Sequence, residues 1–217
     1  MRNVEKDEKE MAAKRELMLE KGFRMFTEDS IESVSMHSVA SACGIGPATL
    51  YRYFNTKLAL VTTICARQWK DYFREVELEY AMIGGESFTA AEEFEFYLNS
   101  FISLYAKHTD MLRFNQNFNV YVRHEAGTPE QIKEVFEAIG MFRDKFHVVY
   151  EKALKDGTLK TDIPEEKIFN STMHIMLAVC IRFASGLLVI NEVDMTEELI
   201  MLKDMMMDKY VIREKRQ

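Results

Sequence analysis

The sequence predicts an all-α protein of about nine helices, in which an N-terminal three-helix helix-turn-helix domain precedes a C-terminal helical bundle, and the chain forms a dimer. Apolar residues recur every three to four positions along most of the 217 residues, which is the period of amphipathic helices. Only three prolines and nine glycines are present, too few for the many turns of a β-sandwich or barrel. Fifteen Phe, nine Tyr and fifteen Met provide more apolar bulk than a disordered chain has.

The first 60 residues predict three helices. The first covers residues 8–27, where apolar side chains fall on one face. Ser35 is expected to cap a short second helix, which Gly44 ends in a left-handed conformation. Pro47 opens the third helix, because its missing N–H has no partner in a first helical turn.

Six more helices are expected in the rest of the chain. Asn55 or Thr56 caps the first of them, and Gly127, Pro164 and Thr196 mark the beginnings of three others. No segment has the alternation of a strand. The expected helices cover residues 57–80, 88–107, 111–124, 132–156, 163–190 and 197–213.

Charge is distributed unevenly along the chain. Residues 1–60 carry as many Lys and Arg as Asp and Glu, so the net charge of −7 arises after residue 60. No acidic residue lies between Ser33 and Leu60, a stretch that contains Arg52 and Lys57. Such a stretch can approach a polyanion although the whole chain is acidic.

Several classes of site and location are excluded by the sequence. Three cysteines without a CxxC pair favour a reducing compartment and predict neither disulfides nor a zinc site. The charged N-terminus is not a signal peptide, and the most apolar stretch, residues 175–190, contains Arg182 and is too short to span a membrane. There is no GxSxG, Walker A or HExxH motif. We therefore expect a cytoplasmic protein that is not an enzyme, uses no cofactor or metal, and does not bind membranes.

Residues 34–60, VSMHSVASACGIGPATLYRYFNTKLAL, have the composition of a helix-turn-helix. Ala40 is small enough to let two short helices approach, and Ile45 and Leu50 fill the angle between them. The N-terminal end of the second short helix is then exposed, where it can meet base edges in a major groove. Lys57 and the free N–H groups at the start of the following helix would bind a phosphate.

These residues resemble the DNA-binding domain of the tetracycline-repressor (TetR) family. The resemblance is carried by residues 50–57, LYRYFNTK, together with Val39-Ala40 and Gly44-Ile45. It implies a ligand-responsive transcriptional regulator, typically a repressor, that binds double-stranded operator DNA as a homodimer. Ser30 and Gly22 depart from the family pattern, and Gly22 is expected to cost about 1 kcal/mol of helix propensity.

The resemblance also indicates which residues contact DNA, with Pro47 and Ala48 at the variable base-reading positions. Alternatives remain for some of them: the tyrosines could be half-buried aromatic residues, Lys57 a solvated lysine and His37 an idle surface residue. The expected DNA-binding residues are Ser35, Met36, His37, Pro47, Ala48, Thr49, Tyr51, Tyr53 and Lys57.

The aromatic side chains of residues 94–146 belong mostly to a bundle core, but some are expected to line an apolar cavity for a small apolar or aromatic effector of unknown identity. Amides and histidines near this face would supply a few polar contacts, since buried amides are costly unless paired. The alternative is that each histidine is an ordinary surface or core residue. The candidate ligand-binding residues are Phe101, Asn115, Phe118, Asn119, Tyr121, Phe146, His147 and His174.

The last two helices carry apolar and small side chains that form a candidate dimer interface, although they could instead close the chain's own core. The candidates are Ile175, Val179, Phe183, Gly186, Leu202 and Met206. The expected domains are residues 1–60, which bind DNA, and residues 61–217, which bind ligand and dimerise. The alternative function is a helical small-molecule-binding module that does not bind DNA.

Overall fold

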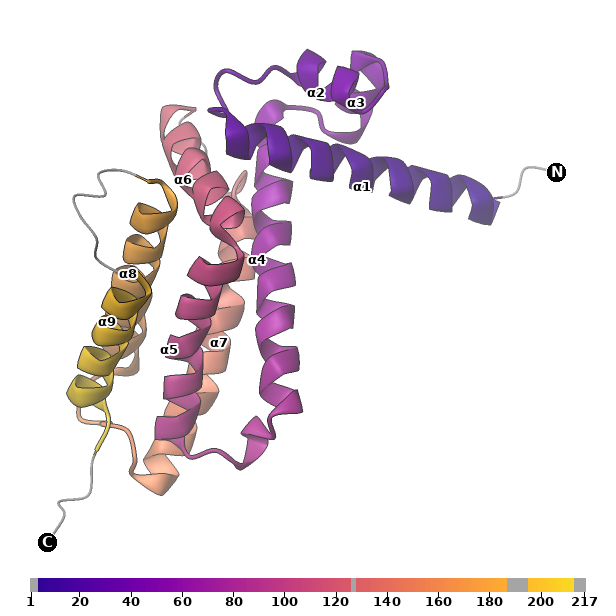
Figure 1. The fold of residues 1–217 in the computed structure, drawn as a ribbon. Helices are drawn as coiled ribbons and strands as arrows, with labels where there is room; N and C mark the ends of the chain where they lie inside the picture. Colours follow the sequence, from indigo (N-terminus) through magenta and orange to yellow (C-terminus); the bar gives the residue numbers. More distant parts are fainter. Residues whose placement is uncertain (1–3, 126–127, 187–194, 213–217) are drawn as a thin grey trace, which may run out of the picture. The chain divides into compact units, whose positions relative to one another are not determined.

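The computed structural model describes residues 4–125, 128–186 and 195–212, and within these ranges the protein is helical (Figure 1). Nine α-helices, one 3-10 helix and an isolated antiparallel bridge between Leu159 and Val211 make up its regular structure there. The predicted all-α fold of about nine helices is confirmed. The elements are α1 (Val4–Glu28), α2 (Met36–Ala42), α3 (Pro47–Tyr53), α4 (Lys57–Met82), η1 (Gly85–Ser87), α5 (Ala90–Lys107), α6 (Thr109–His124), α7 (Lys133–Asp156), α8 (Glu165–Ala184) and α9 (Met195–Tyr210).

The chain divides into two compact units. The first contains residues 1–69 and 114–138, and the second contains residues 70–113 and 139–217. Helices α4, α6 and α7 are continuous and contribute residues to both units. The domain boundary expected at residue 60 falls inside α4 and stays a prediction.

The first unit has its own apolar core, to which α1, α2, α3 and the N-terminal part of α4 contribute. Phe26, Val39, Leu50 and Leu60 are each fully buried, and α2 packs against both α1 and α3. Close packing also explains Gly22. A Cβ atom at Gly22 would lie 3.0 Å from Cδ1 of Ile64, so the glycine lets α1 and α4 approach each other.

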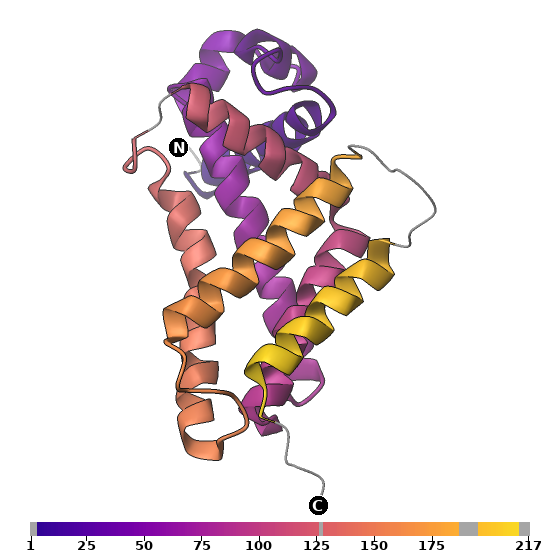
Figure 2. The ribbon, with the colours of Figure 1, turned by 90° about the vertical axis from the view of Figure 1, so that its left-hand side faces the viewer.

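In the second unit α5 packs against α8 and α9, and these two helices run antiparallel, side by side (Figure 2). The core here includes the buried side chains of Leu98, Leu104 and Leu199. A buried carboxylate, that of Glu93, is 1% exposed and pairs with the Lys152 ammonium. Charge pairing is what makes burial of that carboxylate tolerable.

Three predicted helix boundaries near the C-terminus need correction. Helix α8 ends at Ala184 rather than near residue 190, because Gly186 adopts a left-handed φ of +66° and Arg113 Nε donates to the Ala184 carbonyl at 2.8 Å. Thr196 is not the N-cap of the last helix, which already begins at Met195. The last helix ends at Tyr210 rather than near residue 213, and the predicted boundary at Gly127 lies outside the described residues.

Candidate nucleic-acid interface and ligand cavity

A capping box fixes the start of α2. Ser35 Oγ accepts from the Ser38 backbone N–H at 3.0 Å, and Ser38 Oγ accepts from the Ser35 N–H at the same distance. The predicted cap is therefore confirmed. At the other end Gly44 has a φ of +66°, the left-handed conformation that the sequence predicts for the turn between α2 and α3.

Helix α3 buries one face and exposes the other. Pro47 occupies its first turn, as predicted, and Leu50 is its one fully buried residue. Ala48 and Tyr51 are exposed, the Tyr51 side chain by 42%. Arg52 is exposed as well, while Thr49 and Tyr53 are half-buried. The exposed face is therefore available to an external partner of the unit.

Lys57 begins α4, as predicted, and is only partly free. Its Nζ donates to the backbone carbonyl of Glu32 at 3.2 Å and lies 5.5 Å from the centre of the Tyr121 ring. Burial lowers the pKa of Lys57, while the negative charges of Glu32 and Glu125 oppose that shift. An ammonium group has three donors, so donors remain for a phosphate oxygen. Thr56 Oγ1 accepts from the Ala59 N–H at 3.0 Å, which confirms Thr56 as the N-cap of α4.

Cationic groups lie around α3 within the first unit. The Arg15 guanidinium is 5.4 Å from the Phe54 ring centre, and that of Arg52 is 5.9 Å from the Tyr53 ring centre. Arginines stacked in this way keep their outward N–H groups available to anions.

The start of α2 offers fewer side chains for DNA contact than the sequence predicts. Met36 is 5% exposed, so its side chain belongs to the core and does not offer a DNA contact. Met36 is the first residue of α2, and its side chain faces the interior of the unit. Ser35 is exposed, but its hydroxyl is engaged in the capping box, whereas His37 is exposed on the surface.

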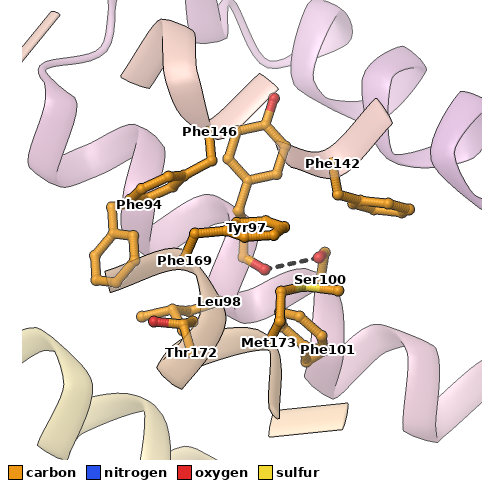
Figure 3. Close-up of a pocket in the computed structure, with 10 residues that line it drawn as sticks. All are labelled: Phe94, Tyr97, Leu98, Ser100, Phe101, Phe142, Phe146, Phe169, Thr172 and Met173. Atoms are coloured by element: carbon orange, nitrogen blue, oxygen red, sulfur yellow. Dashed lines mark hydrogen bonds between the residues drawn. The ribbon is translucent and has the colours of Figure 1, made fainter. Parts of the chain in front are cut away.

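A small cavity of about 40 Å³ lies in the second unit, between α5, α7 and α8 (Figure 3). Its wall is mainly aromatic, with Phe146 of α7 and Phe94 of α5 among the rings in view. Two of the predicted ligand-binding residues, Phe101 and Phe146, line it. The lining residues are Phe94, Tyr97, Leu98, Ser100, Phe101, Phe142, Phe146, Phe169, Thr172 and Met173.

Three other predicted ligand-binding residues belong to the core of the first unit. Asn115 is 6% exposed, and its Oδ1 accepts from Trp69 Nε1 at 3.3 Å. Phe118 stacks with Phe114, and Tyr121 lies under Lys57. Their side chains pair within that unit and do not line the cavity.

The last three predicted ligand-binding residues are on the surface. Asn119 and His174 are exposed. His147 is also exposed, and its Nδ1 lies 3.0 Å from a carboxylate oxygen of Glu165, which raises the pKa of the histidine. His147 and His174 are next in sequence to the lining residues Phe146 and Met173, but both histidines are exposed and neither lines the cavity.

Sequence reasoning missed most of the cavity wall, although a signal for it exists. Each α5 lining residue has another lining residue three or four positions away, and so do Phe142 and Phe146 of α7. On α8 the pair Phe169 and Thr172 has the same spacing. The pattern identifies three inward faces, but no single sequence shows which inward faces meet.

The candidate dimer residues are divided between surface and core. Ile175 is 38% exposed, and Phe183 is half-buried, with its ring packed edge-on against Tyr105. Met206 is 8% exposed and belongs to the unit's own core. Val179 and Leu202 are half-buried, and Gly186 is exposed. The exposed apolar residues of α9 are Ile200, Met201 and Met205.

The described part of the chain lacks a cluster of metal ligands and a membrane-spanning helix. No group of three or more His, Cys, Asp or Glu side chains there could hold a metal ion. None of the described helices is both long and apolar enough to cross a bilayer. Cys43, Cys65 and Cys180 are free thiols, and burial raises the pKa of each.

The N-terminal region of the chain matches a known family of proteins. Residues 15–64 match the bacterial regulatory proteins of the tetR family. Two uncharacterised HTH-type transcriptional regulators of Mycobacterium tuberculosis are each 38% identical to this chain over 72 residues. That match covers 33% of this chain and 35% of each relative, so the chain spans about a third of the length of the curated relatives it matches.

Solved structures resemble nearly the whole chain. The fatty acid degradation regulator FadR from Bacillus halodurans has a TM-score of 0.69 at 12% identity, covering 89% of this chain and 94% of that one. The regulator FadR from Bacillus subtilis, solved in complex with stearoyl-CoA, has a TM-score of 0.65 at 12% identity, covering 88% and 96%. At these identities the likeness shows the fold.

Proposed function

The chain belongs to the tetR family of bacterial regulatory proteins through its N-terminal region, and from this premise we propose that it is a ligand-responsive repressor that binds operator DNA as a homodimer. Residues 15–64, which match the family, include the whole of α2 and α3. A regulatory role on DNA also implies the cytoplasm and a non-enzymatic activity.

The exposed face of α3 is the observation that carries the proposal. Ala48 and Tyr51 lie on this face, and Arg52 adds positive charge beside them. The stretch from Ser33 to Leu60 contains no acidic residue, so no carboxylate within it would repel a phosphate backbone. We assign Pro47, Ala48 and Thr49 to base edges in the major groove, where apolar side chains can contact thymine methyl groups. Tyr51, Tyr53 and Lys57 would contact phosphates, and His37 would lie beside the backbone.

Dimerisation is proposed because one short recognition helix reads too little sequence for a specific operator. A two-fold dimer presents two such helices about 34–36 Å apart, which matches half-sites one helical turn apart. The exposed apolar residues of α8 and α9, among them Ile175, Met201 and Met205, provide the surface that a second copy would cover. Phe183, at the end of α8, would extend it.

The cavity between α5, α7 and α8 is the proposed effector site. Its wall is apolar, which suits a small apolar or aromatic molecule. The ligand of Bacillus subtilis FadR, stearoyl-CoA, shares an apolar part with this class. A free volume of about 40 Å³ is too small for such a molecule, so binding must displace aromatic rings of the wall. An effector that binds only the displaced arrangement would shift the population away from the operator-binding state.

Selection of bound fragments from the genome of the source organism tests the proposal. We expect the recovered fragments to share an inverted repeat whose half-site centres are about 10 base pairs, or a multiple of that, apart. The alternative, a helical small-molecule carrier, predicts fragments with no common site. Recovery of fragments without a common site, even at low salt, would therefore contradict the proposal that the protein is a repressor.

A further inference from the structure

We propose that the hydroxyl of Thr172 is the specificity-determining contact of the cavity, and that the ligand is a small uncharged molecule with an apolar body and one neutral oxygen. The proposal rests on the effector site assigned above and names the chemistry of its ligand. Thr172 lies on α8, lines the cavity and is 6% exposed (Figure 3). Its Oγ1 has no hydrogen-bond partner among the described residues.

The other polar side chains of the wall already use their hydrogens. Ser100 Oγ donates to the Tyr97 backbone carbonyl at 2.7 Å, the bond drawn in Figure 3. The Tyr97 hydroxyl donates to Oε1 of Glu77, also at 2.7 Å, and Glu77 in turn pairs with Lys145 at 3.1 Å. Thr172 is thus the polar lining side chain whose hydroxyl hydrogen has no acceptor among the described residues. A buried hydroxyl without a partner costs free energy, so a ligand that pairs with it gains that amount on binding.

A water molecule is a poor occupant of this space. The volume of about 40 Å³ could hold one. A stable buried water, however, makes about two to four hydrogen bonds to polar groups. Since the hydrogens of Ser100 and Tyr97 are engaged elsewhere, Thr172 supplies the side-chain donor that a water would find in this wall. An apolar molecule with a single oxygen matches this wall better.

The charge of the ligand follows from the same wall. None of the described lining residues is Asp, Glu, Lys, Arg or His. A carboxylate or ammonium placed there would lose its hydration without gaining a counter-charge, which is strongly unfavourable. The ligand that fits is therefore a neutral alcohol, phenol or ketone. Phe142 and Phe169 are half-buried, so they are the rings that can move to admit it.

The test uses three probes with the same ring and a different polar group: p-cresol, toluene and p-toluate. Their binding to the full-length protein is measured by isothermal titration calorimetry. We expect p-cresol to bind on the order of tenfold more tightly than toluene, because toluene leaves the Thr172 hydroxyl unpaired. The carboxylate of p-toluate should make it the weakest of the three.

Two substitutions at one position separate the hydroxyl from the shape of the side chain. Thr172→Val should reduce the preference for p-cresol over toluene to about onefold, whereas Thr172→Ser should keep it. Thr62→Val is the matched control. Thr62 is 4% exposed, its Oγ1 also lacks a partner among the described residues, and it belongs to the first unit and does not line the cavity. This control should leave the preference unchanged.

Thermal unfolding without a probe gives an independent measurement. Removing an unpaired buried hydroxyl should raise the Tm by about 2–4 °C in both Thr172→Val and Thr62→Val. A Tm that falls in Thr172→Val would show that the hydroxyl has a partner, and the proposal would be wrong. An unchanged preference in Thr172→Val, tightest binding of p-toluate, or no binding of any probe would also overturn it.

Failure of this proposal can be told apart from failure of the proposed function. Operator selection requires no ligand, so a protein that selects an inverted repeat but shows no Thr172-dependent preference is a regulator with a different ligand. A protein that shows the preference and selects no common DNA site has this ligand site but is not the repressor.

Discussion

The Lys57 ammonium lies 5.5 Å from the centre of the Tyr121 ring, and this contact joins the first residue of α4 to the last turn of α6. The two side chains affect each other. Burial, with smaller contributions from the charges of Glu125 and Glu32, raises the pKa of Tyr121 to about 12. A tyrosine is neutral at physiological pH even without this shift, and the face of its neutral ring is a partner for the cation. The position of the proposed phosphate-binding lysine thus depends on α6.

Lys57→Gln should weaken binding to every DNA sequence by a similar factor, because the side chain is assigned to a phosphate. The slope of log K against log salt should become shallower by about 0.9, which is the contribution of one phosphate contact. Fluorescence anisotropy on operator and unrelated DNA measures both quantities. Lys133→Gln, which removes an exposed lysine paired with Glu137, is the control and should change neither. Normal binding by Lys57→Gln would show the phosphate assignment to be wrong.

Ala48→Gln should change which base is preferred at one position of each half-site. The glutamine amide can pair with adenine in the major groove, and the loss of the original contact should weaken the natural operator by about 1–3 kcal/mol. Repeating the fragment selection with the variant measures the change. Since Ala48 is exposed, unfolding should stay within about 0.5 kcal/mol of the parent. An unaltered preference would exclude Ala48 from the base-reading surface.

Gly85→Ala should destabilise the protein by about 1–3 kcal/mol, because the new Cβ would overlap a ring carbon of Tyr80. Gly140→Ala is its control. Gly140 lies inside α7 with nothing within 4 Å of an added Cβ, so alanine there should stabilise by about 1 kcal/mol. Urea unfolding measures both changes. If Gly85→Ala were as stable as the parent protein, the packing described around Tyr80 would be wrong.

The His147–Glu165 pair predicts a small pH dependence. The hydrogen bond and the charge of Glu165 raise the pKa of His147 above its ordinary value of 6.5. Protonation is therefore favoured in the folded state, and the pair stabilises the protein fully below about pH 6.5 and loses its effect as pH rises through the raised pKa. NMR titration should show the raised value in the parent and a return toward the ordinary one in Glu165→Gln. An identical His147 titration in both proteins would show that Glu165 does not raise the pKa of His147.

Much of the fold follows from local sequence. Ser35 caps α2, Gly44 adopts the left-handed turn, and Pro47 opens α3, because each depends on backbone chemistry within a few residues. The inward orientation of Met36 was missed since it depends on contacts made by the folded unit. Gly22 shows the same limit. Its role is a close approach between α1 and α4, which helix propensity alone does not describe.

The ligand cavity was the least predictable part. Phe101 and Phe146 were identified because aromatic residues on an inward face are visible in the helical period. The need of a buried amide for a partner predicts Asn115 as a ligand contact, but Trp69 supplies that partner within the first unit. Thr172 was not identified, since an unpaired hydroxyl can be recognised only when every neighbouring donor and acceptor is placed.

The central claim, that this chain acts on DNA through α3 and the start of α4, is tested most directly by the salt dependence of its affinity for a selected operator fragment. Each neutralised phosphate should contribute about −0.9 to the slope of log K against log salt, so several contacts give a steep fall in affinity between low and physiological salt. Affinity that is absent at low salt, or that does not change with salt, would contradict the account.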